Sequence, residues 1–175
     1  STPSSNSKND IVKDFHVSEK NISVIPNGID HNKFSPKENI KRLPGQLITT
    51  ASADVPLKGL DFTLKAIHSL KKEFPERIVS SLYEGFGFPV GEAMACSIPL
   101  IATNVASIPE ITSSFAELIP EKDPNSIELV IRKIFLNPSK YQIRADAGRI
   151  HIIENYDWQK IAKQYENLIY QTIEK

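Results

Sequence analysis

The chain has 175 residues, of which 40% are hydrophobic and 24% charged, and its 21 Lys and Arg are balanced by 21 Asp and Glu. This length suits one domain with a real hydrophobic core, and the composition is that of an ordinary globular protein rather than a disordered or fibrous one. The zero formal net charge excludes the basic excess that drives binding to nucleic acid or to anionic membranes.

Cysteine usage and hydropathy suggest where the protein works. Cys96 is the single cysteine, which excludes an internal disulfide framework and fits a reducing compartment. No apolar run approaches the length of a membrane span, and the first ten residues have neither the charged start nor the apolar core of a signal peptide. We therefore expect a cytoplasmic protein whose sequence begins at an internal cut.

The first quarter of the chain predicts a short helix, a strand and a hinge. Ile11, Val12 and Phe15 can share one helical face, which indicates a helix over residues 8–15. The β-rich run at residues 21–25 predicts a strand, and the polar stretch that follows is interpreted as a hinge. We expect a single donor-binding domain over residues 1–175, with the hinge inside 1–44 and a terminal amphipathic helix in 156–175.

Strand-like and helix-like segments alternate through the rest of the chain. β-branched or apolar runs predict strands at 45–51, 78–80, 99–103 and 116–119, and apolar residues at helical spacing predict helices at 60–74, 89–96, 127–136 and 158–172. Parallel neighbouring strands need such crossover connections. The predicted fold class is α/β, with a Rossmann-like, mostly parallel sheet flanked by helices.

A glycine-rich loop between a strand and a helix carries the chemistry. Gly85 and Gly87 remove side chains that would keep a phosphate or a sugar from the backbone amides, and Pro89 suits the first position of a helix. Glu84 precedes the loop and Glu92 follows one turn into the helix, so both carboxylates can accept hydrogen bonds from sugar hydroxyls. Two glycines alone indicate only a turn, but this combination favours a binding site.

The same stretch, SLYEGFGFPVGEAMACSIPLIAT at residues 81–103, resembles the signature of family 4 glycosyltransferases, which have the two-domain GT-B fold. Residues 24–30 with Phe34 resemble the segment that joins the two domains of that family. Residues 107–110 resemble its donor-side loop, and residues 156–158 the start of its terminal helix. The resemblance covers nearly the whole chain and implies the C-terminal, donor-binding half of a retaining enzyme.

The resemblance also implies roles for individual residues. Glu84 would act at the donor sugar as the catalytic residue, Glu92 would bind the ribose, and Lys58 would bind phosphate. The residues expected to hold the donor sugar and diphosphate are Lys58, Gly85, Phe86, Gly87 and Phe88. The donor would be a UDP- or GDP-sugar, and no metal or other cofactor is implied, because cations and backbone dipoles would offset the leaving diphosphate.

Three departures from the family pattern stand out. Ala53 occupies the position of a family arginine, and Ala106 and Ser107 replace two glycines. Between Ile78 and Val79 the chain lacks the strand and helix units that the family has there, so we expect that a segment, normally including the nucleobase pocket, is missing. We also expect the N-terminal, acceptor-binding domain to be absent, so the isolated chain would be inactive and would meet a membrane only through that domain.

Two other functions compete with this one. A non-catalytic nucleotide-sugar-binding or partner-docking subunit of a split transferase would use the apolar stripe of residues 158–172. A dinucleotide-binding oxidoreductase is disfavoured, because no GxGxxG follows the first strand near Ala51. The four histidines show no metal-ligand spacing, Cys96 is interpreted as a buried structural thiol, and Trp158 as a core anchor.

Overall fold

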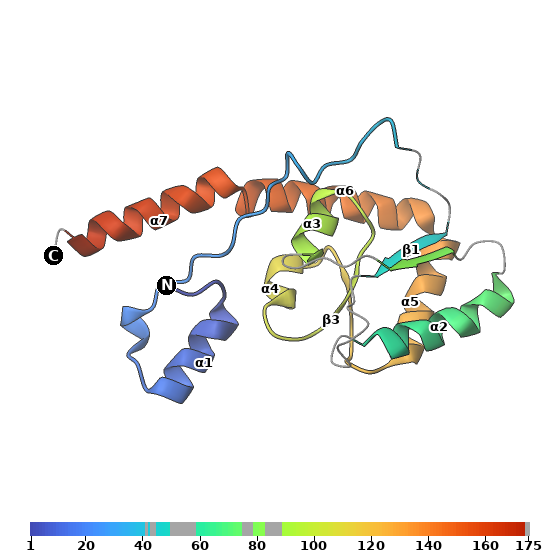
Figure 1. The fold of residues 1–175 in the computed structure, drawn as a ribbon, viewed down its shortest axis with the longest axis horizontal. Helices are drawn as coiled ribbons and strands as arrows, with labels where there is room; N and C mark the ends of the chain where they lie inside the picture. Colours follow the sequence, from blue (N-terminus) through green and yellow to red (C-terminus); the bar gives the residue numbers. More distant parts are fainter. Residues whose placement is uncertain (41, 43–44, 50–58, 75–78, 83–88, 174–175) are drawn as a thin grey trace.

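The computed structural model of the protein describes residues 1–40, 42, 45–49, 59–74, 79–82 and 89–173. In this part of the chain, strands and helices alternate from the first strand to the helix that follows the fourth strand, and two further helices come after it (Figure 1). The elements are α1 (Ser5–Phe15), the 3-10 helix η1 (Glu19–Asn21), β1 (Gln46–Thr49), α2 (Leu60–Glu73), β2 (Val79–Leu82), α3 (Pro89–Ala95), β3 (Ile101–Thr103), α4 (Ile108–Thr112), β4 (Glu117–Ile119), α5 (Pro124–Leu136), α6 (Pro138–Asn155) and α7 (Trp158–Ile173).

The described strands form two parallel pairs. β1 pairs with β2 in the register Gln46 to Val79, and β3 pairs with β4 in the register Ile101 to Glu117. The parallel α/β prediction is confirmed, although the described residues make two two-stranded sheets rather than one. β1 is also less buried than expected, since the side chain of Ile48 is 59% exposed.

A direct pairing of β1 with β2 fits a doubly wound sheet from which units have been lost. In the common order 3-2-1-4-5-6, the first strand lies beside the fourth. Here the first strand lies beside the strand that precedes α3, and α2 is the one element between them among the described residues. This is the neighbour that the first strand would have if the second and third strands were removed.

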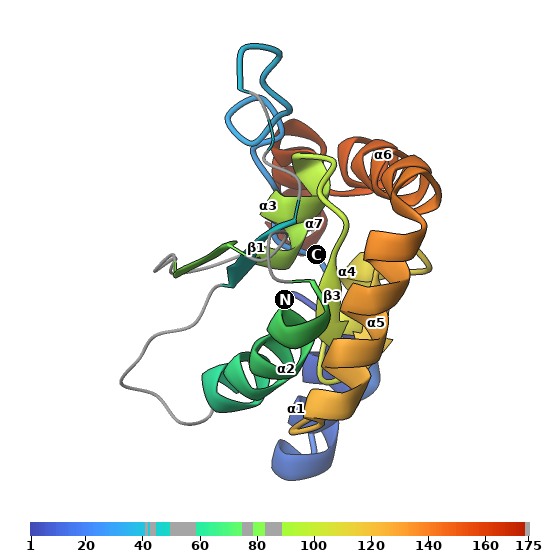
Figure 2. The same ribbon diagram turned by 90° about the vertical axis from the view of Figure 1, so that its right-hand side faces the viewer.

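Two clusters of buried side chains hold the molecule together. The first, here called the hinge core, consists of Ile29, Met94, Ala95 and Ile152, and the second, the sheet core, of Leu70 and Ile131. The sheet core joins α2 to α5, and Figure 2 shows these two helices side by side, next to β3. Leu64, which was expected on the buried stripe of α2, is 47% exposed.

The N-terminal segment and the last helix extend beyond the strands. α7 continues outward from the end of α6, and α1 lies on the same side of the molecule (Figure 1). A single bridge, between Thr2 and Val24, forms where a strand over 21–25 was predicted, and Asn21 belongs to η1 instead. Trp158 is 48% exposed, so the prediction that it is a core anchor is wrong.

α6 and α4 were not predicted from the sequence. α6 has 18 residues and buries Tyr141, Ala145, Gly148 and Ile152 against α3 and the chain around it. α4 begins at Ile108, inside the segment that was interpreted as a loop. Both helices pack on α3, so the surroundings of Glu92 depend on elements that the sequence did not reveal.

Candidate functional site

Most of the predicted site lies outside the described residues. These residues are Glu84, Gly85, Phe86, Gly87, Phe88 and Lys58, together with the departure at Ala53. Glu92 is described and lies in the first turn of α3. The structure therefore shows the surroundings of one predicted site residue, Glu92.

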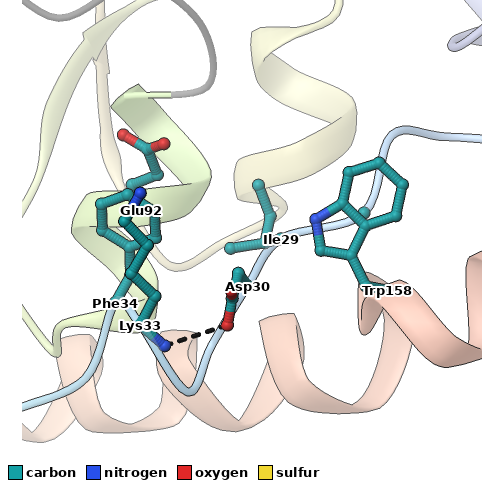
Figure 3. A pocket seen from close by; sticks show the side chains of 7 residues that line it. Ile29, Asp30, Lys33, Phe34, Glu92 and Trp158 are labelled. Atoms are coloured by element: carbon teal, nitrogen blue, oxygen red, sulfur yellow. Dashed lines mark hydrogen bonds between the residues drawn. The ribbon is translucent and has the colours of Figure 1, made fainter.

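Glu92 lines a cavity of about 250 Å³ between α3, the start of α7 and the segment before β1. We call residues 28–34 the hinge segment. They run between α3 and the start of α7, which form the opposite walls of the cavity. Figure 3 shows the segment passing between Glu92 on α3 and Trp158 on α7, with Lys33 and Phe34 on the Glu92 side. The cavity is completed by Gly28, Ile29 and Asp30.

The charge of Glu92 is affected by its surroundings. Partial burial raises the pKa of the Glu92 carboxyl above its ordinary value, and the nearby Lys33 ammonium lowers it in part. Lys33 Nζ also lies 5.3 Å from the centroid of the Phe34 ring, within cation–π range. The cavity thus holds a partly desolvated carboxylate and a cation, an arrangement that suits a ligand with both hydroxyl groups and negative charge.

A tight turn places Lys33 in the cavity. Asp30 Oδ1 accepts hydrogen bonds from the backbone N–H groups of Asn32 and Lys33, at 3.2 and 2.9 Å. Phe34 N–H donates to the carbonyl of Asp30 at 2.8 Å. A short acidic side chain that bonds to amides two and three residues later is a common way to fix such a turn.

The hinge segment is tied to the start of α7. Ile29, 2% exposed, donates its N–H to the carbonyl of Tyr156 at 2.6 Å. His31 Nε2 lies 2.8 Å from Asp157 Oδ2, and the Oδ1 atom of the same carboxylate accepts from the amides of Gln159 and Lys160 at the start of α7. These bonds fix the hinge segment against the start of α7.

Close packing adds to these bonds. A Cβ atom at Gly28 would lie 2.6 Å from Cδ2 and 2.9 Å from Cα of Trp158. A Cβ atom at Gly91, beside Glu92, would lie 2.7 Å from Cδ1 of Ile29. Glycine at these two positions therefore lets the hinge segment approach both α7 and α3.

Residues 107–110, which were interpreted as a donor-side loop, have a structural role. The Glu110 carboxylate accepts hydrogen bonds from the backbone amides of Ser5 and Asn6, at 2.8 and 2.9 Å. Tyr156 donates its hydroxyl to the carbonyl of Glu110 at 3.2 Å. Glu110 therefore secures the first turn of α1 and the end of α6.

Sequence reasoning missed Lys33, Asp30 and Trp158 as cavity residues. A signal was present in the hinge segment, because an aspartate, a lysine and a phenylalanine follow the Asn-Gly turn within seven residues.

Cys96 is partly buried, and burial raises the pKa of its thiol. In the described ranges, no group of three His, Cys, Asp or Glu residues is placed to hold a metal ion, and no helix is long and apolar enough to cross a membrane.

Curated proteins and a family profile resemble this chain. The profile described as "Glycosyl transferases group 1" matches residues 77–151. An uncharacterised glycosyltransferase of Methanocaldococcus jannaschii is 33% identical over 163 residues, covering 87% of this chain and 46% of the relative. An MMP alpha-(1->4)-mannosyltransferase of Mycolicibacterium hassiacum is 29% identical over 213 residues, covering 93% of this chain and 51% of the relative.

The length of the mannosyltransferase match bears on the expectation that a segment is missing from this chain. The chain spans about half the length of the curated relatives that it matches. In the mannosyltransferase match, 93% of 175 residues is about 163, whereas the alignment runs over 213 positions. About 50 aligned positions therefore have no residue in this chain, which is the size of one to two βα units.

Solved structures share the fold. A glycosyltransferase from Rickettsia africae superposes with a TM-score of 0.81 at 16% identity, covering 98% of this chain and 62% of that chain. Anabaena HepE in complex with UDP gives 0.80 at 14% identity, covering 97% and 63%. The chain belongs to the group 1, family 4-like glycosyltransferases and forms the C-terminal, Rossmann-like half of their GT-B fold.

Proposed function

We propose that this chain binds a nucleoside diphosphate sugar and supplies the donor half of an enzyme that transfers the sugar to an acceptor with retention of configuration. The observation that carries the proposal is the cavity lined by Glu92, the glutamate that follows the glycine-rich loop in a chain that matches a glycosyltransferase family over residues 77–151. HepE, which shares the fold, has been solved in complex with UDP and with UDP-glucose. A UDP- or GDP-sugar is the donor class that this site would take.

Glu92 is proposed to accept hydrogen bonds from the ribose hydroxyls of the donor. A carboxylate that is partly removed from water exchanges fewer solvent hydrogen bonds when it binds a hydroxyl pair. The raised pKa of Glu92 reflects that removal from water. Binding of the ribose would then give the Glu92 carboxylate hydrogen-bond donors in place of the water that burial has removed.

Lys33 is proposed to add a cation near the donor. It lies in the same cavity as Glu92 and faces it from the hinge segment. With Ala53 in place of the family arginine, such a cation would compensate part of the missing positive charge beside the diphosphate. Glu84, Lys58 and the Gly85–Phe88 amides keep their expected roles in the proposal, and transfer would need no metal.

Turnover is proposed to need the acceptor-binding half of the enzyme. Reacting groups must be held close together for transfer, and in a two-domain enzyme the two halves close on the substrates. This chain corresponds to about half of its curated relatives. By itself it would bind the donor weakly and transfer nothing.

Saturation-transfer NMR tests the proposal with UDP, UDP-glucose, GDP and GDP-mannose as probes. At least one probe should receive saturation from the wild-type chain, with ribose protons among the strongest signals, and Glu92→Ala should weaken that transfer. Glu154→Ala is the matched control, because Glu154 is an exposed glutamate of α6 outside the cavity. If no probe receives saturation from a folded chain, the donor assignment is wrong.

One observation favours a second function, a docking subunit of a split transferase. The outer part of α7 carries Ile169, Tyr170 and Ile173, which are 56%, 56% and 75% exposed. Analytical ultracentrifugation with a separately produced N-terminal half would show a complex in this case. A stable complex, together with no nucleotide binding by wild type or by Glu92→Ala, would favour docking over donor binding.

A further inference from the structure

The end of α3 shows how the Glu92 helix is held in place. Its last turn closes with Ser97 in the left-handed region at φ 53°, and two backbone bonds follow from Ser97 N–H to Met94 O and from Ile98 N–H to Ala93 O. This closure satisfies the carbonyls of Ala93 and Met94. The carbonyls of the next three residues need other donors.

Two arginines supply those donors. Arg149, on α6, donates to the carbonyl of Ala95. Arg42 donates to the carbonyls of Cys96 and Ser97, at 2.7 and 2.9 Å, and the side chain of Gln142 shares Ser97 at 3.1 Å. Positive charges at a helix C-terminus also interact favourably with the helix dipole.

Arg149 makes a second contact that connects the two sides of the cavity. The same terminal nitrogen that bonds to Ala95 lies 3.3 Å from the carbonyl of Phe34, in the hinge segment. Ala95 belongs to the helix that carries Glu92, and Phe34 follows Lys33 directly. One guanidinium therefore joins the helix of the carboxylate to the segment of the cation.

We propose that Arg149 is a positioning residue for the donor site: it sets the spacing between Glu92 and the hinge segment without touching the donor. Arg149 is absent from the set of residues that line the cavity. A guanidinium has several donors in a rigid plane, so it can hold two carbonyls in a fixed relation, whereas a lysine ammonium is a flexible point charge. This inference rests on the proposed function of Glu92.

α6 offers a matched control in Arg144, which lies on the same helix five residues before Arg149. Arg144 also bonds to backbone carbonyls, those of Ser114 and Ala116, and pairs with Glu117. It makes the same kind of contact from the same helix, but to the strand β4 instead of to α3. Loss of Arg144 should lower stability without changing the spacing around Glu92.

The test compares Arg149→Met, Arg149→Lys and Arg144→Met by thermal unfolding and by UDP affinity. Arg149→Met should weaken UDP binding by about tenfold, and Arg144→Met by less than about twofold, although both lower the midpoint of unfolding. Arg149→Lys should recover part of the lost stability but little of the affinity. Equal loss of affinity in Arg149→Met and Arg144→Met, or full rescue of affinity by lysine, would overturn the proposal.

A second readout works without any nucleotide. If Arg149 holds the hinge segment on α3, its loss should let water reach Glu92, and NMR titration should show the pKa of Glu92 moving toward its ordinary value. Arg144→Met should leave that titration unchanged. Failure of wild type to bind either UDP or GDP would contradict the donor assignment alone, whereas an unchanged Glu92 titration in Arg149→Met would contradict the positioning role.

Discussion

The hinge core and the sheet core differ in what they hold together. The hinge core joins segments that are far apart in the sequence, namely the hinge segment, α3 and α6, and two of its members or neighbours, Ile29 and Phe34, line the Glu92 cavity. The sheet core joins α2 and α5 under the strands, with Phe74 and Phe135 packed edge to face at 5.5 Å, and none of its residues lines that cavity. Stability and site geometry are therefore expected to be separable in this molecule.

The largest expected effect comes from the same substitution made in each core. Ile152 is 0% and Ile131 3% exposed, so Ile152→Ala and Ile131→Ala should each cost about 2–5 kcal/mol of unfolding free energy. Urea denaturation measures the costs, and UDP titration at a temperature where both variants are folded measures the site.

Only Ile152→Ala should also weaken UDP binding, because only Ile152 packs behind a wall of the cavity. If either variant is too unstable, the milder pair Ile152→Val and Ile131→Val makes the same comparison, at about 0.5–1.5 kcal/mol each. An equal change of affinity in the two variants would show that the cores are not separable.

A smaller effect is expected where the hinge segment meets α7. Gly28→Ala would place its Cβ 2.6 Å from Cδ2 and 2.9 Å from Cα of Trp158, and such overpacking costs about 1–3 kcal/mol. Trp158 is the single tryptophan of the chain, so its fluorescence reports the change directly.

The control for Gly28→Ala is the same substitution in a Trp158→Leu background, where the smaller side chain leaves more room. Part of the cost should disappear there, as residues in contact are not additive. The same cost in both backgrounds would mean that the backbone, rather than the indole ring, resists the new methyl group.

The smallest expected effect is on the bond between the hinge segment and the first turn of α7. Hydrogen bonds from the Lys160 amide, from His31 and from the Gln159 amide lower the pKa of Asp157. A carboxyl with a lowered folded-state pKa stabilises the fold above its unfolded pKa near 3.8, and that contribution is lost as the pH falls through the folded value. Asp157→Ala should therefore cost about 0.5–2 kcal/mol at pH 7, and less below about pH 4.

Asp123→Ala is the matched variant on the sheet side, since Asp123 accepts from the Asn125 and Ser126 amides at the start of α5. Urea denaturation at pH 7 and pH 3 measures both stabilities. Asp157→Ala alone should also reduce UDP affinity, because Asp157 holds the hinge segment. A destabilisation by Asp157→Ala that does not change with pH would contradict the role of its charge.

The sequence indicated the elements with strong local signals. α2 and α7 show apolar residues at helical spacing, and β1, β3 and β4 are short β-branched or apolar runs between turn residues. The parallel α/β class follows from their alternation. These features depend on neighbours within the chain, which is why they can be predicted without the structure.

α6 shows why other parts were missed. It buries Tyr141, Ala145, Gly148 and Ile152, of which two are small, while Ile143 and Ile150 on the same helix are 71% and 57% exposed. Its sequence therefore lacks a stripe of large apolar residues, although Pro138 at its start was a usable signal. Because α6 was not predicted, the roles of Arg149 and Ile152 could not be inferred from the sequence either.

The cavity itself depends on contacts between distant residues. Ile29 meets Tyr156, and His31 meets Asp157, across more than 120 positions of the chain. A single sequence carries no local pattern for such pairs. The family resemblance identified Glu92 as a site residue, but only the structure shows that Lys33 and Trp158 line the same cavity.

The central claim, that Glu92 binds the ribose of a nucleotide-sugar donor, is tested most directly by calorimetry with UDP and its 2′,3′-dideoxy analogue. Wild type should lose about tenfold or more in affinity when the hydroxyls are removed, since hydrogen bonds to a charged group are among the stronger ones. Glu92→Ala should bind the two ligands with nearly equal affinity. If Glu92→Ala distinguishes UDP from the dideoxy analogue as well as wild type does, the ribose is bound elsewhere and the account is wrong.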